Sequence, residues 1–167
     1  GVADVFLLSG VDLFPVCHLR QCRNAHFIMV EDEATCRRMA FHQQKLAFVL
    51  ASMRDHAALL RRAGFSVRYF DLDAGTTWRD ALASTARAVN VDRILCFDGE
   101  NRLTRRVFPD LAREHGLRLT RIPTPMFVTD TADLDGYFAG KHRRMGHFYK
   151  QQRRRFDLLV ELSLIHI

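Results

Sequence analysis

Cysteine is scarce in this chain, and its four thiols, Cys17, Cys22, Cys36 and Cys96, include no C-x-x-C pair. Zinc sites and dithiol redox centres typically need such close spacing, so the sequence argues against both, and against an iron–sulfur cluster held by these residues. Cys96 lies within an apolar, strand-like run, where a thiol behaves as a small hydrophobic side chain. We therefore expect reduced, buried or half-buried thiols, as in a cytosolic protein.

Long apolar stretches and secretory features are also lacking. No run approaches the roughly 18 residues that a membrane-spanning helix needs, and residues 1–4 lack the pattern of a signal peptide. The chain contains 4 Pro and 9 Gly, and it has neither a Pro- or Gly-rich linker nor an internal repeat. With 48% hydrophobic and 26% charged residues, the composition excludes disorder. We expect a cytoplasmic protein without a membrane partner.

Two common phosphate-binding loops are absent, because neither G-x-G-x-x-G nor G-x-x-x-x-G-K-S/T occurs. No set of nucleophile, base and acid can be recognised either. His42 and Lys45 lie one turn apart on the same face of a predicted helix, but no second metal ligand has suitable spacing. We expect His42 to have a structural role near the start of that helix. The sequence thus predicts no catalytic residue and no metal site.

What the sequence does contain is a regular alternation of strands and helices. Short apolar runs bounded by Gly, Pro or acidic residues predict strands buried on one or both faces. Between them, apolar residues recur at helical spacing, most clearly from Leu46 to Leu60. This alternation predicts an α/β fold, a Rossmann-like five-stranded parallel sheet with helices on both faces. The strand order stays open, and residues 11–23 show no period. The five runs are residues 5–8, 26–30, 67–70, 93–97 and 118–122.

Positive charge is concentrated towards the C-terminal end. The formal charge is +6, and seven of the 25 Lys and Arg residues lie between Lys141 and Arg155, where there is no Asp or Glu. The other 18 basic residues nearly balance the 19 acidic ones. From about residue 132 the strand–helix alternation gives way to helical spacing alone. We expect an α/β domain over residues 1–131 and a helical C-terminal exit segment over residues 132–161.

Acidic and small residues follow three of the predicted strands, at the edge where open parallel sheets bind ligands. Glycine permits close backbone approach, and carboxylates accept hydrogen bonds from hydroxyl or ring N–H groups. Because clustered acids repel phosphate, this edge favours a neutral heterocycle or a polyhydroxylated ligand. The alternative is that the acids only solvate loop ends and cap helices. The candidate cofactor-binding residues are Gly10, Asp12, Glu31, Glu33, Thr35, Asp98, Gly99 and Glu100, with Lys45 as a supporting residue.

The basic segment, residues 141–155, is a second candidate site. It interleaves Phe148 and Tyr149 with cations, and single-stranded nucleic acids are held by such cations and stacking rings. Alternatively, the segment is a helix that packs Phe148 inward and pairs its arginines with acids of a neighbouring domain. The candidate nucleic-acid or interdomain residues are Lys150, Arg153, Arg154 and Arg155.

Three segments together resemble the cryptochrome/photolyase family, and within it the photolyase-related branch of the bacterial iron–sulfur type. Residues 41–54 (FHQQKLAFVLASMR) are similar to the family's H-x-x-K helix, which continues into a small residue, Met and a basic residue. Residues 124–127 (TPMF) resemble its S/T-P-x-F turn after the fifth strand. The strongest similarity is that of residues 145–155 (MGHFYKQQRRR) to its M-x-x-F-Y-R/K-x-x-R-R stretch. The chain departs from the family's G-D-Q-L and P-G-E-x-R turns at residues 10–13 (GVDL) and 98–102 (DGENR).

The resemblance implies a function. In such proteins the N-terminal α/β domain holds an antenna pigment, a ribityl-lumazine in studied members, and a following helical domain holds FAD, the iron–sulfur cluster and the DNA lesion. It therefore implies that this chain is an antenna-chromophore-binding domain, which has no enzymatic activity alone. The longer protein is then a DNA photolyase or a photoreceptor. The implied partners are the flavin-binding helical domain of the same protein and DNA. The alternatives are a basic nucleic-acid-binding module without pigment, or a vestigial pocket. Residues 162–167 resemble a translated sequencing adapter, and we expect them to be an artefactual tail.

Overall fold

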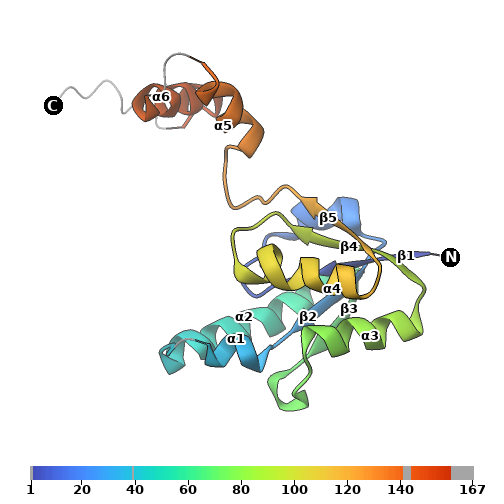
Figure 1. Ribbon diagram of the computed structural model, residues 1–167. Helices are drawn as coiled ribbons and strands as arrows, with labels where there is room; N and C mark the ends of the chain where they lie inside the picture. The colour runs from blue at the N-terminus through green and yellow to red at the C-terminus, as the bar shows by residue number, and fades with distance from the viewer. Residues whose placement is uncertain (1, 39, 141–143, 159–167) are drawn as a thin grey trace. The chain divides into compact units, whose positions relative to one another are not determined.

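The structure of the chain is a computed structural model that describes residues 2–38, 40–140 and 144–158 (Figure 1). The chain divides into two units, Gly1–Pro125 and Met126–Ile167, and each is described by itself. The predicted tail, residues 162–167, lies outside the described residues, as does the end of the predicted exit segment.

The first unit is built on a five-stranded sheet in the order β3-β2-β1-β4-β5. Every neighbouring pair of strands is parallel, which confirms the predicted α/β, Rossmann-like class. After β3 the chain crosses to the other side of β1, so a topological switch lies between β1 and β4, the place where open sheets bind ligands. The strands are β1 (Ala3–Leu7), β2 (His26–Val30), β3 (Ser66–Phe70), β4 (Val91–Phe97) and β5 (Arg118–Ile122).

The C-terminal parts of the central strands β1, β2 and β4 are continuous apolar runs because both faces of the sheet are covered there. Successive side chains of a strand point to opposite faces. In and just after β1, Val5 and Leu7 belong to one buried core, whereas Phe6 and Leu8 belong to the other. A continuous apolar run is therefore the pattern that this sheet requires.

One face of the sheet is covered by α2 (Gln43–Arg62) and by the 3-10 helix η1 (Val16–Cys22). The apolar stripe of α2 meets the sheet through Met53, Ala57 and Leu60, which are all buried. This confirms the predicted long helix. The helix ends before Gly64, which adopts the left-handed conformation (φ 84°) typical of a helix terminus.

The other face is covered by α3 (Trp78–Ala88) and α4 (Phe108–Glu114). Trp78 and Phe108 are both buried, and their rings meet edge to face with centroids 5.0 Å apart. Such a pair stabilises the contact beyond the burial of its area. The two helices thus pack on each other as well as on the sheet, and helices cover both faces as predicted.

Four short helical elements are not predicted by the periodicity of the sequence. One of them is η1, which occupies the aperiodic stretch of residues 11–23. Elements this short offer too few residues for a helical period to show. In the described part of the chain, no helix has the length and apolarity that crossing a membrane demands. The other three short elements are α1 (Glu33–Arg37), η2 (Leu72–Ala74) and the π-helical turn η3 (Leu103–Val107).

The described residues of the second unit form two helices, α5 (Thr131–Phe138) and α6 (Met145–Arg155), in agreement with the helical character expected of this segment. Phe148 is buried between the two helices, and its ring lies 4.9 Å from that of Tyr137 and 5.8 Å from that of Phe138, centroid to centroid. Phe148 therefore anchors α6, while the cations of the same helix remain at the surface.

Two adjacent leucines of α2 test which side of this helix packs against the sheet. Leu60 is fully buried, whereas Leu59 is 40% exposed. We expect Leu60→Ala to lower the free energy of unfolding by about 2–5 kcal/mol, because it leaves a cavity in the core. Leu59→Ala should lower it by less than about 1 kcal/mol. Denaturant unfolding followed by circular dichroism measures both, and equal losses would contradict the packing of α2.

Candidate functional site

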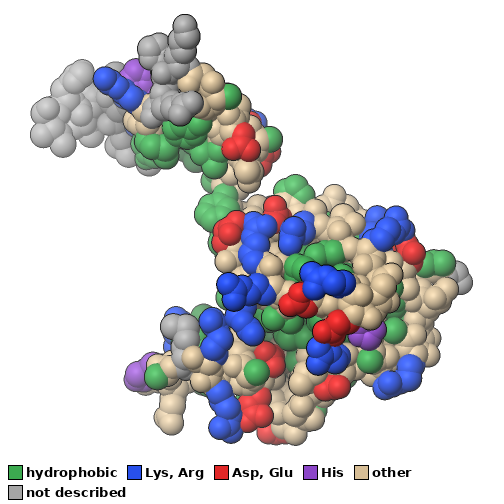
Figure 2. All heavy atoms as spheres, in the orientation of Figure 1, with side chains coloured by type: hydrophobic (Ala, Val, Ile, Leu, Met, Phe, Trp, Pro, Cys, Tyr) green, Lys and Arg blue, Asp and Glu red, His purple; other side chains and the backbone are tan. Residues whose placement is uncertain are grey.

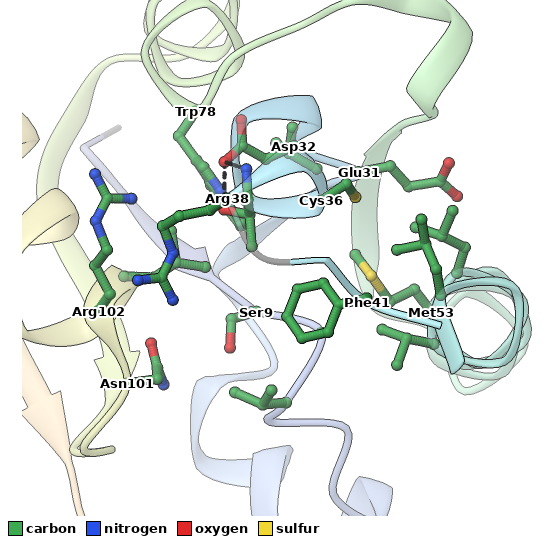
Figure 3. Close-up of a pocket in the computed structure, with 18 of the residues that line it drawn as sticks. Ser9, Glu31, Asp32, Cys36, Arg38, Phe41, Met53, Trp78, Asn101 and Arg102 are labelled. Carbon is green, nitrogen blue, oxygen red and sulfur yellow. Dashed lines mark hydrogen bonds between the residues drawn. The ribbon is translucent and has the colours of Figure 1, made fainter. Parts of the chain in front are cut away.

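A cavity of about 270 Å³ lies at the carboxyl ends of the strands of the first unit (Figure 3). Pockets for small molecules typically have roughly 300–1,000 Å³, so this one suits a single small ring system. Its position beyond β1, β2 and β4 is the one expected for a ligand site next to a topological switch. Its wall is formed by Ser9, Gly10, Val11, Val30, Glu31, Asp32, Thr35, Cys36, Arg38, Phe41, Lys45, Leu46, Val49, Leu50, Met53, Trp78, Asn101, Arg102 and Leu103.

The apolar side of the cavity comes mainly from the first half of α2. The apolar stripe of this helix is longer than the sheet face that it covers. Met53 is buried in the core, but Leu46, Val49 and Leu50 stay half-buried and line the cavity. Phe41, just before the helix, adds an aromatic ring to the same wall. The stripe that predicted a core helix thus also forms the apolar wall of the cavity.

Gly10 brings the loop after β1 close to α2. A Cβ atom at this position would lie 2.7 Å from the Met53 sulfur and 3.4 Å from Cγ1 of Val49. A side chain there would therefore push Met53 aside and change the wall of the cavity. Gly10 thus allows close approach of this loop to α2, and its predicted approach to a ligand stays a prediction.

Glu31 lines the cavity, but its carboxylate is directed away from it (Figure 3). Arg54 donates two hydrogen bonds to it, from Nε to Oε1 at 2.6 Å and from Nη2 to Oε2 at 2.8 Å. The Tyr69 hydroxyl also donates to Oε1, and the backbone N–H of Leu72 donates to Oε2 at 2.8 Å. The side chain is fully buried. Glu31 therefore joins the end of β2 to α2, β3 and η2, and its carboxylate is already occupied.

The electrostatics of this network favour the ionised carboxylate. Burial by itself would raise the pKa of Glu31, but the hydrogen bonds from Arg54, Tyr69 and Leu72 outweigh it and lower the pKa below its usual value. Burial, and then the carboxylate of Glu31, raise the pKa of the Tyr69 hydroxyl. The network is thus a charged carboxylate held by a guanidinium and a neutral phenol.

The other acidic residues that follow β2 stabilise the short helix α1. Asp32 caps this helix by accepting hydrogen bonds from the Thr35 backbone N–H at 3.1 Å and from the Thr35 hydroxyl at 2.5 Å. Thr35 lines the cavity as predicted, although its hydroxyl proton is already donated to Asp32. Glu33 is not part of the wall, because it is exposed and forms an ion pair with Arg37 at 2.6 Å.

The acids after β4 lie outside the wall as well. Arg105 forms ion pairs with both Asp98, at 3.1 Å, and Glu100. Asp98 also lies 3.9 Å from Arg121 of β5. These carboxylates are neutralised by arginines of the fold, so they do not form the acidic, ligand-binding edge that we expected from the sequence.

Asp12 and Gly99 are buried together behind the cavity wall. Asp12 accepts a 2.5 Å hydrogen bond from the Ser9 hydroxyl, and Ser9 itself lines the cavity. A Cβ atom at Gly99 would lie 3.6 Å from Oδ1 of Asp12, an oxygen for which the described residues provide no hydrogen-bond donor. Burial raises the pKa of Asp12, and the hydrogen bond from Ser9 only partly offsets this effect. Asp12 therefore supports Ser9 and does not itself line the cavity.

Two further cations line the cavity, Arg38 and Arg102, and neither is among the residues predicted from the sequence. Arg38 follows α1, a helix too short to predict, and Arg102 follows β4 in the loop that leads to η3. Lys45, which was predicted, completes the set, and its ammonium lies 5.3 Å from the centre of the Phe41 ring. Figure 2 shows Lys and Arg side chains gathered on the first unit between α1 and α4. The wall is therefore basic, and the acids from which we expected repulsion of phosphate are paired with arginines of the fold or lie outside the wall.

Histidine and cysteine do not form a metal site in the described residues, where no suitable cluster of His, Cys, Asp and Glu occurs. His42 caps α2 by accepting a 3.2 Å hydrogen bond at Nδ1 from the Gln44 backbone N–H, which confirms its structural role. Cys22 and Cys96 are buried, whereas Cys36 lines the cavity and Cys17 is exposed. Burial raises the pKa of Cys96 to about 12, so this thiol is inert.

The predicted basic surface lies on α6 in the second unit. Two of its four cations already have partners within this unit. Arg155 forms a 2.6 Å ion pair with Asp133 of α5, and Arg153 lies over the Tyr149 ring and donates to the Leu158 carbonyl. The other two, Lys150 and Arg154, are exposed. Tyr149 itself is 57% exposed.

An open parallel sheet with helices on both faces and a cavity beside its topological switch defines a Rossmann-like α/β domain. The family model described as "Deoxyribodipyrimidine photo-lyase-related protein" matches residues 10–163, so the chain belongs to this photolyase-related family. A similar curated protein is the (6-4) photolyase of Agrobacterium fabrum (strain C58 / ATCC 33970), which is 25% identical over 137 residues, 80% of this chain. The match covers 27% of that protein, so the chain spans about a quarter of its relative's length.

The network around Glu31 makes a pH-dependent prediction. Glu31→Gln should lower the free energy of unfolding at neutral pH by about 1–3 kcal/mol, because it weakens hydrogen bonds to a charged group. The folded-state pKa lies below the unfolded value of about 4.3, so this stabilisation is fully present above about pH 4.3. It is lost as the pH falls through the folded-state pKa, and the two proteins should then converge.

Urea unfolding at a series of pH values measures this difference. Glu33→Gln is a matched control, because Glu33 is an exposed acid in an ion pair with Arg37. It should change the free energy by no more than about 0.5 kcal/mol. A difference between wild type and Glu31→Gln that does not depend on pH would contradict the proposed network.

Proposed function

We propose that this chain is the antenna-pigment domain of a photolyase-related flavoprotein, and that its cavity holds a flat heterocycle of the ribityl-lumazine type. The observation that supports this most directly is the cavity itself, about 270 Å³ in volume and situated at the carboxyl edge of the sheet. Membership of the photolyase-related family agrees with this assignment. The chain alone has no enzymatic role in this proposal.

The wall of the cavity supports a heterocyclic guest. Phe41, Leu46 and Val49 offer an apolar surface on which a ring can lie. Trp78 also lines the cavity, and its large ring is buried.

The activity of a longer protein belongs to the same proposal. FAD and an iron–sulfur cluster would be bound by a helical part beyond these residues, and the residues described here would position the pigment and contact that part. Within the family the flavin supplies the redox chemistry, and the protein contributes position and electrostatics. The proposal therefore assigns light-dependent DNA repair or photoreception to the longer protein and light collection to this domain.

Binding of 6,7-dimethyl-8-ribityllumazine tests the proposal. We expect the visible absorbance and fluorescence of this pigment to change on addition of the chain. Leu46→Trp should weaken binding by at least about tenfold, or 1.4 kcal/mol, because it fills the cavity.

Phe48→Trp is the matched control, since Phe48 is 72% exposed on the same helix and does not line the cavity. It should bind the pigment as the wild type does. No spectral change with the wild-type chain would exclude the pigment, and equal binding by Leu46→Trp would exclude this cavity.

A second candidate function is the binding of single-stranded nucleic acid by α6. The observation in its favour is the exposed Tyr149 ring, which carries the Arg153 guanidinium 5.8 Å from its centre and lies next to Lys150. Cations beside exposed aromatic rings are how single strands are bound without sequence preference.

This second function predicts a steep dependence on salt. Lys150→Gln combined with Arg154→Gln should weaken binding of a labelled oligonucleotide and reduce the slope of log affinity against log salt by about 0.7 per residue. Arg20→Gln combined with Arg87→Gln removes the same charge from the first unit and should have little effect. Fluorescence anisotropy measures both, and unchanged affinity in the first variant would rule out α6 as the binding surface.

A further inference from the structure

Among the charged groups that line the cavity, the positive ones are those left without a partner of opposite charge. The carboxylate of Glu31 is directed away and paired with Arg54, and that of Asp32 is engaged in capping α1. The remaining charged residues of the wall are Arg38, Lys45 and Arg102. Within the described part of the chain, no ion pair with an acid is found for any of these three. The cavity therefore offers positive charge that the fold itself does not neutralise.

Two of these charges, Arg38 and Arg102, lie at one end of the cavity, whereas the Lys45 ammonium lies beside the Phe41 ring. Figure 3 shows Arg38, Arg102 and Asn101 together on one side, and Phe41 and Met53 on the other. Arg38 comes from the end of α1 and Arg102 from the loop after β4, so two separate elements bring guanidinium groups to the same end. The cavity is thus divided into a cationic end and an apolar end. A ligand that matches it has a flat ring system at one end and an anion at the other.

Phosphate is the anion that this end suits best. Guanidinium groups bind phosphate oxygens through paired, charge-assisted hydrogen bonds, and an amide such as that of Asn101 can donate a further one. We propose that the pigment in this cavity carries a phosphomonoester, held between Arg38 and Arg102, while its ring lies against Phe41 and α2. This inference rests on the proposed function and specifies its ligand: a phosphorylated ribityl heterocycle in place of a neutral one.

Riboflavin and its 5′-phosphate, FMN, form a matched pair of probes, because they differ only in the phosphate group. We expect the chain to bind FMN roughly 10- to 100-fold more tightly than riboflavin, as one or two hydrogen bonds to a charged group would give. The preference should shrink as the salt concentration rises, because exposed charges are screened. Quenching of flavin fluorescence measures both affinities.

Arg38→Gln combined with Arg102→Gln should lower the affinity for FMN to about that for riboflavin and so remove the preference, and the circular-dichroism spectrum of the variant reports that it is folded. Arg87→Gln combined with Arg106→Gln removes the same charge from exposed positions outside the cavity, and it should retain the preference. If wild type binds both flavins equally, or binds ribityl-lumazine but neither flavin, the phosphate inference is overturned and the pigment function stands. If it binds neither flavin and no ribityl-lumazine, the pigment function is overturned as well.

Discussion

The shape of the cavity depends on the hydrogen bonds that the buried carboxylate of Glu31 accepts. This carboxylate accepts hydrogen bonds from Arg54 of α2, Tyr69 of β3 and the Leu72 backbone at η2, so three elements are tied to the end of β2. A buried carboxylate requires such partners, because leaving it unpaired would cost several kcal/mol. The pairing holds α2 against the sheet while the first half of that helix extends along the cavity. The apolar wall of the cavity follows from this arrangement.

Acidic residues at the sheet edge turned out to stabilise the fold, and arginines turned out to define the cavity. Asp98 and Glu100 are neutralised by Arg105, and Glu33 is neutralised by Arg37. Along the sequence these acids form clusters that suggest a negative edge. In three dimensions each has a cation close by, so the net field in the cavity is set by the cations that remain. Position after a strand therefore identifies the edge of the sheet that carries the cavity, but it does not reveal the sign of the charge there.

The division of the cavity into an apolar and a cationic end connects the fold to the proposed pigment. Antenna pigments need a rigid site, since energy transfer depends on a fixed position of the ring. The apolar end comes from one long helix that is anchored to the sheet core, and helices hold side chains more rigidly than loops do. The cationic end comes from segments that follow β2 and β4, which meet only because the parallel strands bring their carboxyl ends to one edge. Membership of the photolyase-related family agrees with a light-collecting role for such a site.

The sequence by itself determined the α/β class, the parallel strands, the long helix and the family resemblance. These features depend on local periodicity and contiguous motifs, such as the apolar stripe from Leu46 to Leu60 and the segment Met145–Arg155. The tertiary structure alone decided the strand order, the short helices and the chemistry of the cavity. Glu31 and Arg54 lie far apart in the chain, as do Arg38 and Arg102. No local sequence pattern predicts which of these charged residues will come close together. Pairing between distant residues is settled only when the sheet assembles, and that pairing decides which charges are left for a ligand.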